Sequence, residues 1–480
     1  LPGTLSTLRD AMMHASRYTL VLPGLAVYLA AVLSPAVAQQ RPSRAALQRT
    51  VDSLAASALR EGVAGISVGV VRGKDTIVMK GYGMADVEND VPATAQTVHR
   101  IGSITKQFTA AAVMQLVEQG KLSIDDTIGG RVPNLPASWR KATIRHLLNH
   151  TSGIPSYTSA GPRWMSRMRI DLPHDSLLGI VANDSMDFPL GSQWRYNNTG
   201  YYLLGMLIEQ MTGRSYAEVV RDQLAKPLGL QATMYCGTRP VIKRRAQGYQ
   251  LDQADKLVNA DPLSMNQPFA AGALCSTVGD LITWQRALAG GRVVKPQSYT
   301  AMITPEGAAS NRGYGYGLTK DSLAGRMRVQ HGGGINGFNS MLQYFPSDTL
   351  SIAVLVNTNG PWADRIANNI ARAAFGAPLV ASPPRLADLP TTAEERARFA
   401  GTYRLALPNG NTLNLRIFER DGKVISQGDG QGEIPLLYQG NSVFGASFDR
   451  SLRLTFAPGT PAPKVTLLQG GATIDGPRVP

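Results

Sequence analysis

A serine and a lysine three residues apart stand at the start of a predicted helix, where they could form a nucleophile and its base. Ser103 and Lys106 begin a stretch, residues 103–120, whose apolar residues recur at helical spacing up to a glycine. Residues three apart lie on one face of a helix, with their side chains in reach of each other. Serine is also a favoured helix N-cap, because its hydroxyl accepts a bond from a free backbone N–H. The pattern alone leaves both roles open.

The chain contains a second Ser-x-x-Lys, and the expected position of the lysine distinguishes the two. Lys106 would lie in the first turn of a long buried helix, where burial lowers a lysine pKa and the helix N-terminus stabilises a developing oxyanion. Ser138 and Lys141 instead fall in a loop ahead of a short helix that begins at Thr143. Nothing there places both on a common face, so Ser103 is the better candidate.

Two other patterns could carry chemistry. Residues 65–69 spell Gly-x-Ser-x-Gly around Ser67, but the alternation of a strand runs straight through them, whereas a nucleophile elbow needs a sharp turn before a helix. His146 and His150 are four apart, yet Leu147 stands where a zinc hydrolase would carry its glutamate. We reject the elbow and expect no metal; His150 should satisfy the last carbonyls of a helix.

Two later stretches could complete a site. Tyr196 and Asn198 come just before an apolar helix, and a glycine-rich run, His331-Gly-Gly-Gly334, precedes a pair of predicted strands. A loop aromatic and a tight turn would explain each stretch structurally. Glycines also let a ligand approach the backbone closely, as an oxyanion hole or a substrate-binding strand requires.

The start of the chain is typical of a secreted protein. A region with Arg9 and Arg17 precedes an apolar run over residues 19–33 and an Ala-x-Ala sequence at 36–38. This order describes a cleavable signal peptide, and the run is too short to span a bilayer comfortably. We therefore predict a signal peptide over residues 1–38, export to a bacterial periplasm or the cell exterior, and no stable membrane span after cleavage.

Charge and cysteines restrict the partners. The formal net charge is +14, but basic residues are scattered, the densest run being 243–245, and no nucleic-acid motif accompanies them. We expect a small-molecule or peptide substrate, with cell-wall peptide as a candidate, and no nucleic acid. The two cysteines, Cys236 and Cys275, could form one disulfide in an oxidising compartment, but their spacing does not decide it.

The pattern of apolar residues predicts an α+β domain. A helix over residues 47–62 is followed by a hairpin, 66–79, and late in the chain two paired strands, 341–345 and 351–356, precede a helix over 363–375. We expect the hairpin and the late strands to share one antiparallel sheet, with helices packed against it and a helix-rich middle.

The chain is long enough for two domains, and its texture changes after a Pro/Ala-rich stretch. We predict a catalytic domain over 39–376, a linker over 377–392 and a small all-β domain over 393–480, where short alternating strands succeed one another. The strands we expect there are 413–417, 424–425, 452–456 and 465–468.

Three motifs in order resemble a known family. Ser-x-x-Lys at Ser103, Tyr-x-Asn at Tyr196 and His-x-Gly at His331 are similar to the three motifs of class C β-lactamase-type serine hydrolases, which include penicillin-binding D,D-peptidases and related esterases. The stretches IRHLLNHTSGIPSY, YNNTGYYLLGMLIEQMTG, KPLGLQATMY and GALCSTVGDLITW also look like that family's framework. The resemblance covers about residues 45–376, and the tail resembles the lipocalin-like domain that some members append.

The resemblance implies a β-lactamase/transpeptidase-like fold and a role for each residue. Ser103 would be the acylated nucleophile, and we expect it also to cap the helix. Lys106 and Tyr196 would share the proton transfers, with the tyrosine protonating the leaving group, and which of them removes the serine proton stays open. Asn198 would orient the lysine and the substrate amide.

The third motif departs from the pattern of familiar β-lactamases. The resemblance implies that His331 and Gly333 belong to a substrate-binding strand, and that the backbone N–H groups of Ser103 and Gly334 form the oxyanion hole. Familiar β-lactamases carry Lys-Thr-Gly here, whose charge faces the substrate carboxylate. His331 would be largely neutral at pH 7 and Gly332 has no hydroxyl, so recognition of carboxylates is in doubt.

We therefore predict an exported serine hydrolase that uses an acyl-serine intermediate and no cofactor. Its substrate would be an amide or ester: a D-amino-acid peptide, a small ester or a β-lactam. The alternative is a catalytically silent penicillin- or peptidoglycan-binding protein that keeps the pocket but does no chemistry. Metal-dependent hydrolysis is a third hypothesis, which the spacing of the histidines does not favour.

Overall fold

A computed structural model of the chain describes residues 42–252, 255–381, 386–406, 412–429, 433–446, 449–469 and 472–480. The predicted signal peptide, residues 1–38, lies outside these residues. In the part of the chain that is described, no helix has both the length and the apolar character that a bilayer crossing requires.

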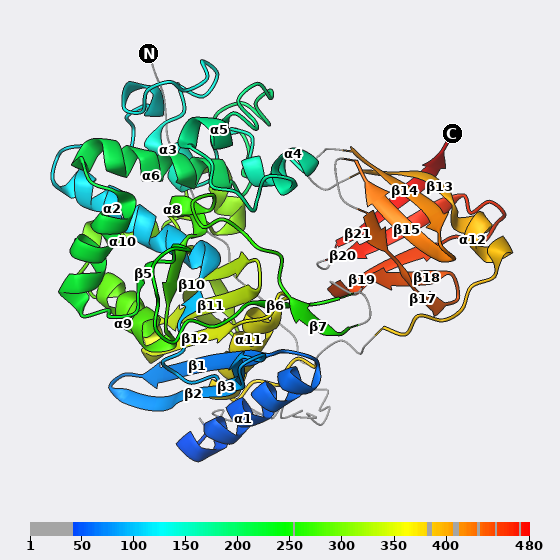
Figure 1. Cartoon of the computed structure of the whole chain (residues 1–480), viewed down its shortest axis with the longest axis horizontal. Coiled ribbons are helices and arrows are strands. Elements are labelled where there is room, and N and C mark those ends of the chain that lie inside the picture. Colours follow the sequence, from blue (N-terminus) through cyan, green and yellow to red (C-terminus); the bar gives the residue numbers. More distant parts are fainter. Residues whose placement is uncertain are drawn as a thin grey trace, which may run out of the picture. The chain divides into compact units, whose positions relative to one another are not determined.

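The first domain is built on a seven-stranded antiparallel sheet. Its strand order is β3-β2-β1-β12-β11-β10-β9, so the first hairpin of the chain pairs with strands that lie almost 300 residues later (Figure 1). The bounds are β1 Gly65–Arg72, β2 Asp75–Asp86, β3 Val91–Pro92, β9 Thr319–Leu323, β10 Arg326–Ile335, β11 Phe338–Phe345 and β12 Leu350–Val356. The predicted shared sheet is confirmed.

Helices cover both faces of this sheet because its central strands are apolar on both sides. In β12, Ile352 and Val354 pack with α1 (Arg44–Arg60) and α11 (Trp362–Ala374), whereas Ala353 and Leu355 join the core on the opposite face. Adjacent residues of a strand point to opposite faces, which explains this division. The helices α1 and α11 correspond to the helices predicted over residues 47–62 and 363–375.

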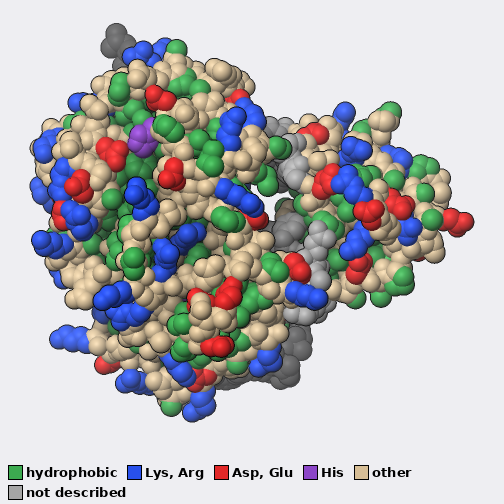
Figure 2. All heavy atoms as spheres, in the orientation of Figure 1, with side chains coloured by type: hydrophobic (Ala, Val, Ile, Leu, Met, Phe, Trp, Pro, Cys, Tyr) green, Lys and Arg blue, Asp and Glu red, His purple; other side chains and the backbone are tan. Residues whose placement is uncertain are grey.

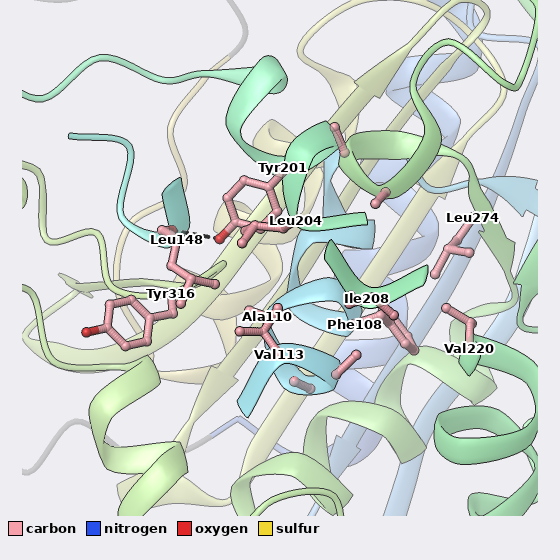
Figure 3. Close-up of a cluster of buried hydrophobic side chains, with 14 of the residues drawn as sticks. Phe108, Ala110, Val113, Leu148, Tyr201, Leu204, Ile208, Val220, Leu274 and Tyr316 are labelled. Atoms are coloured by element: carbon pink, nitrogen blue, oxygen red, sulfur yellow. Dashed lines mark hydrogen bonds between the residues drawn. The ribbon is translucent and has the colours of Figure 1, made fainter. Parts of the chain in front are cut away.

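The larger core lies between the sheet and the helical middle of the chain. Its central helices are α2 (Thr105–Glu118) and α6 (Asn198–Thr212), whose apolar side chains meet as Figure 3 shows. The hydroxyl of Tyr201 donates to the carbonyl of Leu148 at 2.7 Å, which ties α6 to the end of α3 (Ile144–Leu148). This packing fixes the helix starts that carry the candidate site.

The remaining elements of this part are short. The small strands form a three-stranded sheet, β4-β8-β5, and a separate pair, β6-β7; they are β4 His99–Arg100, β5 Met234–Tyr235, β6 Tyr249–Leu251, β7 Leu257–Asn259 and β8 Leu274–Ser276. The remaining α-helices are α4 Pro162–Met165, α5 His174–Leu178, α7 Tyr216–Val219, α8 Phe269–Gly272, α9 Val278–Ala289 and α10 Pro296–Met302, and a π-helical turn, Val220–Ala225, continues α7.

The C-terminal strands form a second, nine-stranded antiparallel sheet in the order β16-β15-β14-β13-β21-β20-β19-β18-β17. The strands β16 and β17 lie at opposite ends of this order, yet only Leu436 separates them in the chain. The sheet must therefore curl into a nearly closed barrel. The helix α12 (Ala393–Phe399) precedes it, and the strands are β13 Gly401–Ala406, β14 Thr412–Arg420, β15 Lys423–Gly428, β16 Glu433–Pro435, β17 Leu437–Gly440, β18 Val443–Ala446, β19 Asp449–Phe456, β20 Lys464–Gln469 and β21 Ala472–Val479.

Both domains have the predicted fold class, α+β followed by a small all-β unit. All four strands that the alternation predicts in the tail belong to the barrel. On the face that Figure 2 shows, Lys and Arg side chains are spread among Asp and Glu rather than gathered in one patch. That distribution agrees with the scatter of basic residues in the sequence.

Candidate active site

Ser103 lies in a tight turn between β4 and α2, next to the backbone of β10. The turn spans Gly102–Ile104, and Gly102 has a φ of +49°, a left-handed conformation that glycine adopts without strain. A Cβ atom on Gly102 would lie 2.9 Å from the carbonyl oxygen of Gly334 and 3.0 Å from its nitrogen. The glycine therefore lets the turn that carries Ser103 approach Gly334 closely.

The prediction that Ser103 caps the helix is wrong. The helix begins at Thr105, the residue at its N-cap is Ile104, and no side chain caps either the helix or the preceding turn. Because the chain enters α2 through a 3₁₀ turn, Ser103 sits inside that turn rather than at the non-helical cap position. Its hydroxyl oxygen instead lies 3.3 Å from Nζ of Lys106.

Lys106 is fully buried in the first turn of α2 and is held by three oxygen atoms. Its Nζ lies 2.8 Å from Oδ1 of Asn198, 2.9 Å from the carbonyl oxygen of Ala271 and 3.3 Å from Oγ of Ser103. Burial lowers the pKa of Lys106 well below its usual range, because the ammonium form loses its hydration. The structure thus brings together three of the predicted residues.

Tyr196 and Asn198 flank the start of α6. The helix begins here because Asn197 caps it, its side chain accepting from the backbone N–H of Gly200 at 2.6 Å. The phenol of Tyr196 lies close to Ser103, and burial raises the pKa of Tyr196 above its usual value. Nζ of Lys106 lies 4.6 Å from the centre of the Tyr196 ring. All four polar residues of the first two motifs therefore meet.

Two residues that the sequence analysis missed hold Asn198 in place. Ser156 Oγ accepts from the backbone N–H of Asn198 at 3.2 Å, and Thr158 Oγ1 accepts from its Nδ2 at 3.0 Å. With its amide nitrogen so engaged, Asn198 presents Oδ1 to Lys106. The only sequence signal was that Ser156 lies in the framework stretch that ends in Ile-Pro-Ser-Tyr.

The glycine-rich run lies at the end of β10, where the strand borders the site. β9 pairs only with Arg326–Gln330, so it does not cover the edge of β10 beyond them. A Cβ on Gly333 would lie 2.0 Å from the carbonyl oxygen of Ile101, whereas a Cβ on Gly334 would meet no atom within 4 Å. The first glycine packs the strand against the turn of Ser103, and the second faces open space that a ligand could fill.

His331 is nearly buried beside the tyrosines. Its ring centre lies 6.2 Å from that of Tyr196, and its Nε2 is hydrogen-bonded to the hydroxyl of Tyr314 at 3.0 Å. Burial, with a smaller effect of the nearby Lys106 amine, lowers the pKa of His331 to about 4. The expectation that this histidine is neutral at pH 7 is therefore confirmed.

His150 also belongs to this cluster, and the role we predicted for it is wrong. Its Nδ1 accepts from the backbone N–H of Asn197 at 3.2 Å, and its ring centre lies 4.4 Å from that of Tyr196 and 4.6 Å from that of Tyr314. A φ of +64° at His150 turns the chain away from α3, so the side chain packs into the site rather than against the helix carbonyls. A left-handed histidine after a helix leaves no clear signal in a sequence.

The rejected motifs lie elsewhere. Ser67 is buried inside β1 and donates to the carbonyl of Thr94 at 2.7 Å, while Ser138 and Lys141 are exposed in a turn. His146 accepts from the backbone N–H of Thr143 in a capping box. Across the described residues, no group of His, Cys, Asp or Glu side chains gathers in a way that could hold a metal ion.

The two cysteines are neighbours in the core. Cys236 and Cys275 are both buried free thiols, and they interact within one small apolar cluster. Strand β8 places Cys275 opposite Arg100, three residues before Ser103. The two sulfur atoms therefore lie side by side behind the strand that leads to the serine.

Comparison with known proteins relates most of the chain to one family. Residues 45–377 match the model of the family described as Beta-lactamase. Protein flp of Staphylococcus aureus (strain MW2) is 27% identical over 339 residues, which are 67% of this chain and 66% of that protein, so the chain spans about two thirds of its relative.

Two solved structures are similar in fold and in sequence. A D-stereospecific amidohydrolase from Streptomyces sp. is 31% identical with a TM-score of 0.60, covering 70% of this chain and 99% of that one. The octameric penicillin-binding protein homologue from Pyrococcus abyssi is 27% identical with a TM-score of 0.60, covering 90% of this chain and 100% of that one. With the family model matching most of its length, the chain belongs to the β-lactamase family of serine hydrolases.

Proposed function

We propose that this protein is an exported hydrolase that cleaves an amide or ester through an acyl-serine intermediate on Ser103. The observation that carries the proposal is the position of Lys106, a fully buried amine 3.3 Å from the serine oxygen. The substrates we propose are D-amino-acid peptides or amides and small esters. The similarity to a D-stereospecific amidohydrolase and to a penicillin-binding protein homologue supports this class.

The partners of Lys106 support its role as the base. The oxygen atoms of Asn198 and Ala271 only accept hydrogen bonds, and a neutral amine has two N–H groups to give them. The lone pair of the nitrogen is then left for the hydroxyl of Ser103, which can donate its proton. The lowered pKa of Lys106 favours this neutral form at the pH of the cell exterior.

Tyr196 is suited to act as the acid. Burial raises the pKa of its phenol, so it is protonated in the resting enzyme, where it lies close to Ser103. In acylation, the serine proton passes to Lys106 as Oγ bonds to the carbonyl carbon, and the bond to the leaving group breaks as Tyr196 protonates that group. Lys106 then returns the proton to the tyrosine.

The oxyanion and the deacylation step use the same surroundings. The backbone N–H groups of Ser103 and Gly334 would hold the oxyanion, and the close approach of Gly102 to Gly334 supports this assignment. Water then attacks the acyl-serine ester, loses a proton to the same pair of side chains, and releases the acid as Ser103 regains its hydroxyl.

Mass spectrometry with a fluorophosphonate probe tests the proposal, and the chain offers a matched control. Wild type and Ser138→Ala should gain one covalent label, because Ser138 belongs to an exposed Ser-x-x-Lys outside the site. Ser103→Ala should gain none while keeping its melting temperature. For protein secreted by a bacterial host, the same spectra should show the mass of a chain that starts at Gln39, as cleavage of the signal peptide on export requires.

Two results would contradict the proposal. A folded wild-type protein that takes up no label and hydrolyses no ester would be a silent binding protein instead. Labelling that persists in Ser103→Ala would place the nucleophile elsewhere.

A further inference from the structure

Both ring nitrogens of His331 are already engaged within the protein. Nδ1 lies 2.6 Å from the carbonyl oxygen of Gly332, which can only accept, so Nδ1 carries the ring proton. Nε2 lies 3.0 Å from the hydroxyl of Tyr314. In the neutral ring this nitrogen has a lone pair, so the tyrosine donates to it. His331 therefore has no N–H left to offer a ligand.

The surroundings of His331 also keep it uncharged. The titratable groups that face it are the amine of Lys106, the imidazole of His150 and the phenols of Tyr196 and Tyr314. None of these is a carboxylate, so none would stabilise an imidazolium, and Lys106 acts against it. The low pKa of His331 follows from this setting and from burial.

Gly332, the residue after His331, supplies no side-chain donor or positive charge for a carboxylate. Gly332 has no side chain, and a Cβ added there would already lie 3.1 Å from the terminal methyl of Met341. This stretch of β10 therefore presents neither a positive charge nor a side-chain donor. An ionised carboxylate that leaves water for such a surface loses hydration without gaining a partner, which is costly.

We propose that Tyr314 is a specificity-determining residue that, by occupying His331, directs the enzyme to acyl donors with an uncharged leaving group, such as esters and carboxamides, and against those with a free carboxylate there. This inference rests on the proposed function. It predicts that the enzyme discriminates between substrates by the charge of their leaving group, and it predicts no preference among acyl groups.

One exposed cation offers a rival route to carboxylates. The guanidinium carbon of Arg312 lies 5.7 Å from the centre of the Trp194 ring, and that ring is 5.9 Å from the ring of Tyr314. Arg312 thus stands over the same aromatic cluster. If it bound substrate carboxylates, the charge of its side chain would cancel the discrimination that Tyr314 provides.

A matched pair of esters tests the proposal. One is the N-acetyl-D-alanyl ester of glycolic acid, and the other is the same ester with the glycolate carboxyl group converted to its primary amide. We expect wild type to cleave the amide form with a kcat/KM at least tenfold higher. Tyr314→Phe keeps the ring and frees Nε2 of His331, so the ratio should fall at least threefold. The fall should be larger at pH 6 than at pH 8, because the freed Nε2 must take up a proton with the bound carboxylate, whose negative charge favours the imidazolium.

The outcomes separate this inference from the function on which it rests. Equal cleavage of the two esters, or a ratio that Tyr314→Phe does not change, would overturn the role of Tyr314 while leaving the acyl-serine mechanism standing. A preference for the carboxylate that Arg312→Gln removes would assign recognition to the arginine instead. If neither ester is cleaved and Ser103 takes no fluorophosphonate label, the proposed function fails and the inference fails with it.

Discussion

Lys106 and Tyr196 experience the same burial with opposite consequences. Removing water destabilises the charged form of each group, so the pKa of the lysine falls and the pKa of the tyrosine rises. Environments that push two pKa values in these directions assign a base and an acid. The sequence left open which residue removes the serine proton, and the burial of both favours the lysine.

Lys106→Arg separates the role of a base from that of a positive charge. Arginine keeps the charge but does not lose its proton at any pH a protein tolerates, so we expect kcat/KM to fall by about 10² to 10⁴-fold. Raising the pH to 9 should not restore it. Wild-type kcat/KM should instead rise as pH increases through the lowered pKa of Lys106. A pH profile of both enzymes checks this, with Lys141→Arg as the control, and an active Lys106→Arg would exclude the lysine as base.

The three-residue spacing was enough to predict that Ser103 and Lys106 lie together, because local backbone geometry alone determines their contact. It did not find Tyr314 or His150. Their hydrogen bonds to His331 and Asn197 cross 17 and 47 residues of chain, and loops set those distances. The capping role of Ser103 failed for a local reason, since a 3₁₀ turn before α2 leaves no distinct sequence pattern.

At the scale of elements, the site depends on how closely β10 approaches the turn before α2. Gly333 is the point of contact, with its Cα facing the carbonyl of Ile101, while Gly334 beside it faces open space. Neighbouring residues of a strand point to opposite sides, so the two adjacent glycines have different structural roles. One permits the packing and the other keeps the site open.

Two alanine variants distinguish the packing role of Gly333 from the role of Gly334 in keeping the site open. Gly333→Ala should lower stability by about 1–3 kcal/mol or more and reduce activity severely, because the new methyl group would lie 2.0 Å from a backbone oxygen that cannot move freely. Gly334→Ala should change the melting temperature little. Thermal melts and ester turnover of both variants check this; equal melting temperatures would mean that the strand and turn can separate without cost.

The expected elements were found where the apolar pattern was regular. The hairpin and the late strands alternate clearly, and α1 buries Leu47, Val51, Ala55 and Ala58 at helical spacing, so their types were predictable. The closure of the C-terminal barrel was not, because it depends on Leu436 alone joining the two edge strands, and a single linking residue carries no periodic signal.

At the scale of the whole molecule, buried histidines make stability sensitive to acid. Burial lowers the pKa of His99 and of His331 to about 4 from an ordinary value of 6.5. Between these values the unfolded chain binds protons that the folded chain does not, so stability is full above pH 6.5 and is lost as pH falls toward 4. Each histidine can contribute up to about 3 kcal/mol of this loss.

Melting temperatures at pH 7.5, 6 and 5 check this. We expect a steady fall, and a shallower fall in His99→Gln, whatever that variant costs at pH 7.5. A melting temperature that is constant from pH 7.5 to 5 would contradict the buried, neutral state of these rings.

The domain boundaries at residues 376 and 392 stay a prediction.

The order of the strands has a consequence for the protein as it is being made. The hydroxyl of Ser340 donates to the carbonyl of Ile101 across 239 residues, and β1 joins the late strands of the sheet through β12. A ribosome therefore releases the serine and its lysine long before the strands that hold the turn in place exist. Contacts so distant in sequence form late. We therefore predict that Ser103, the nucleophile we propose, gains hydrolytic activity only after translation has passed β12.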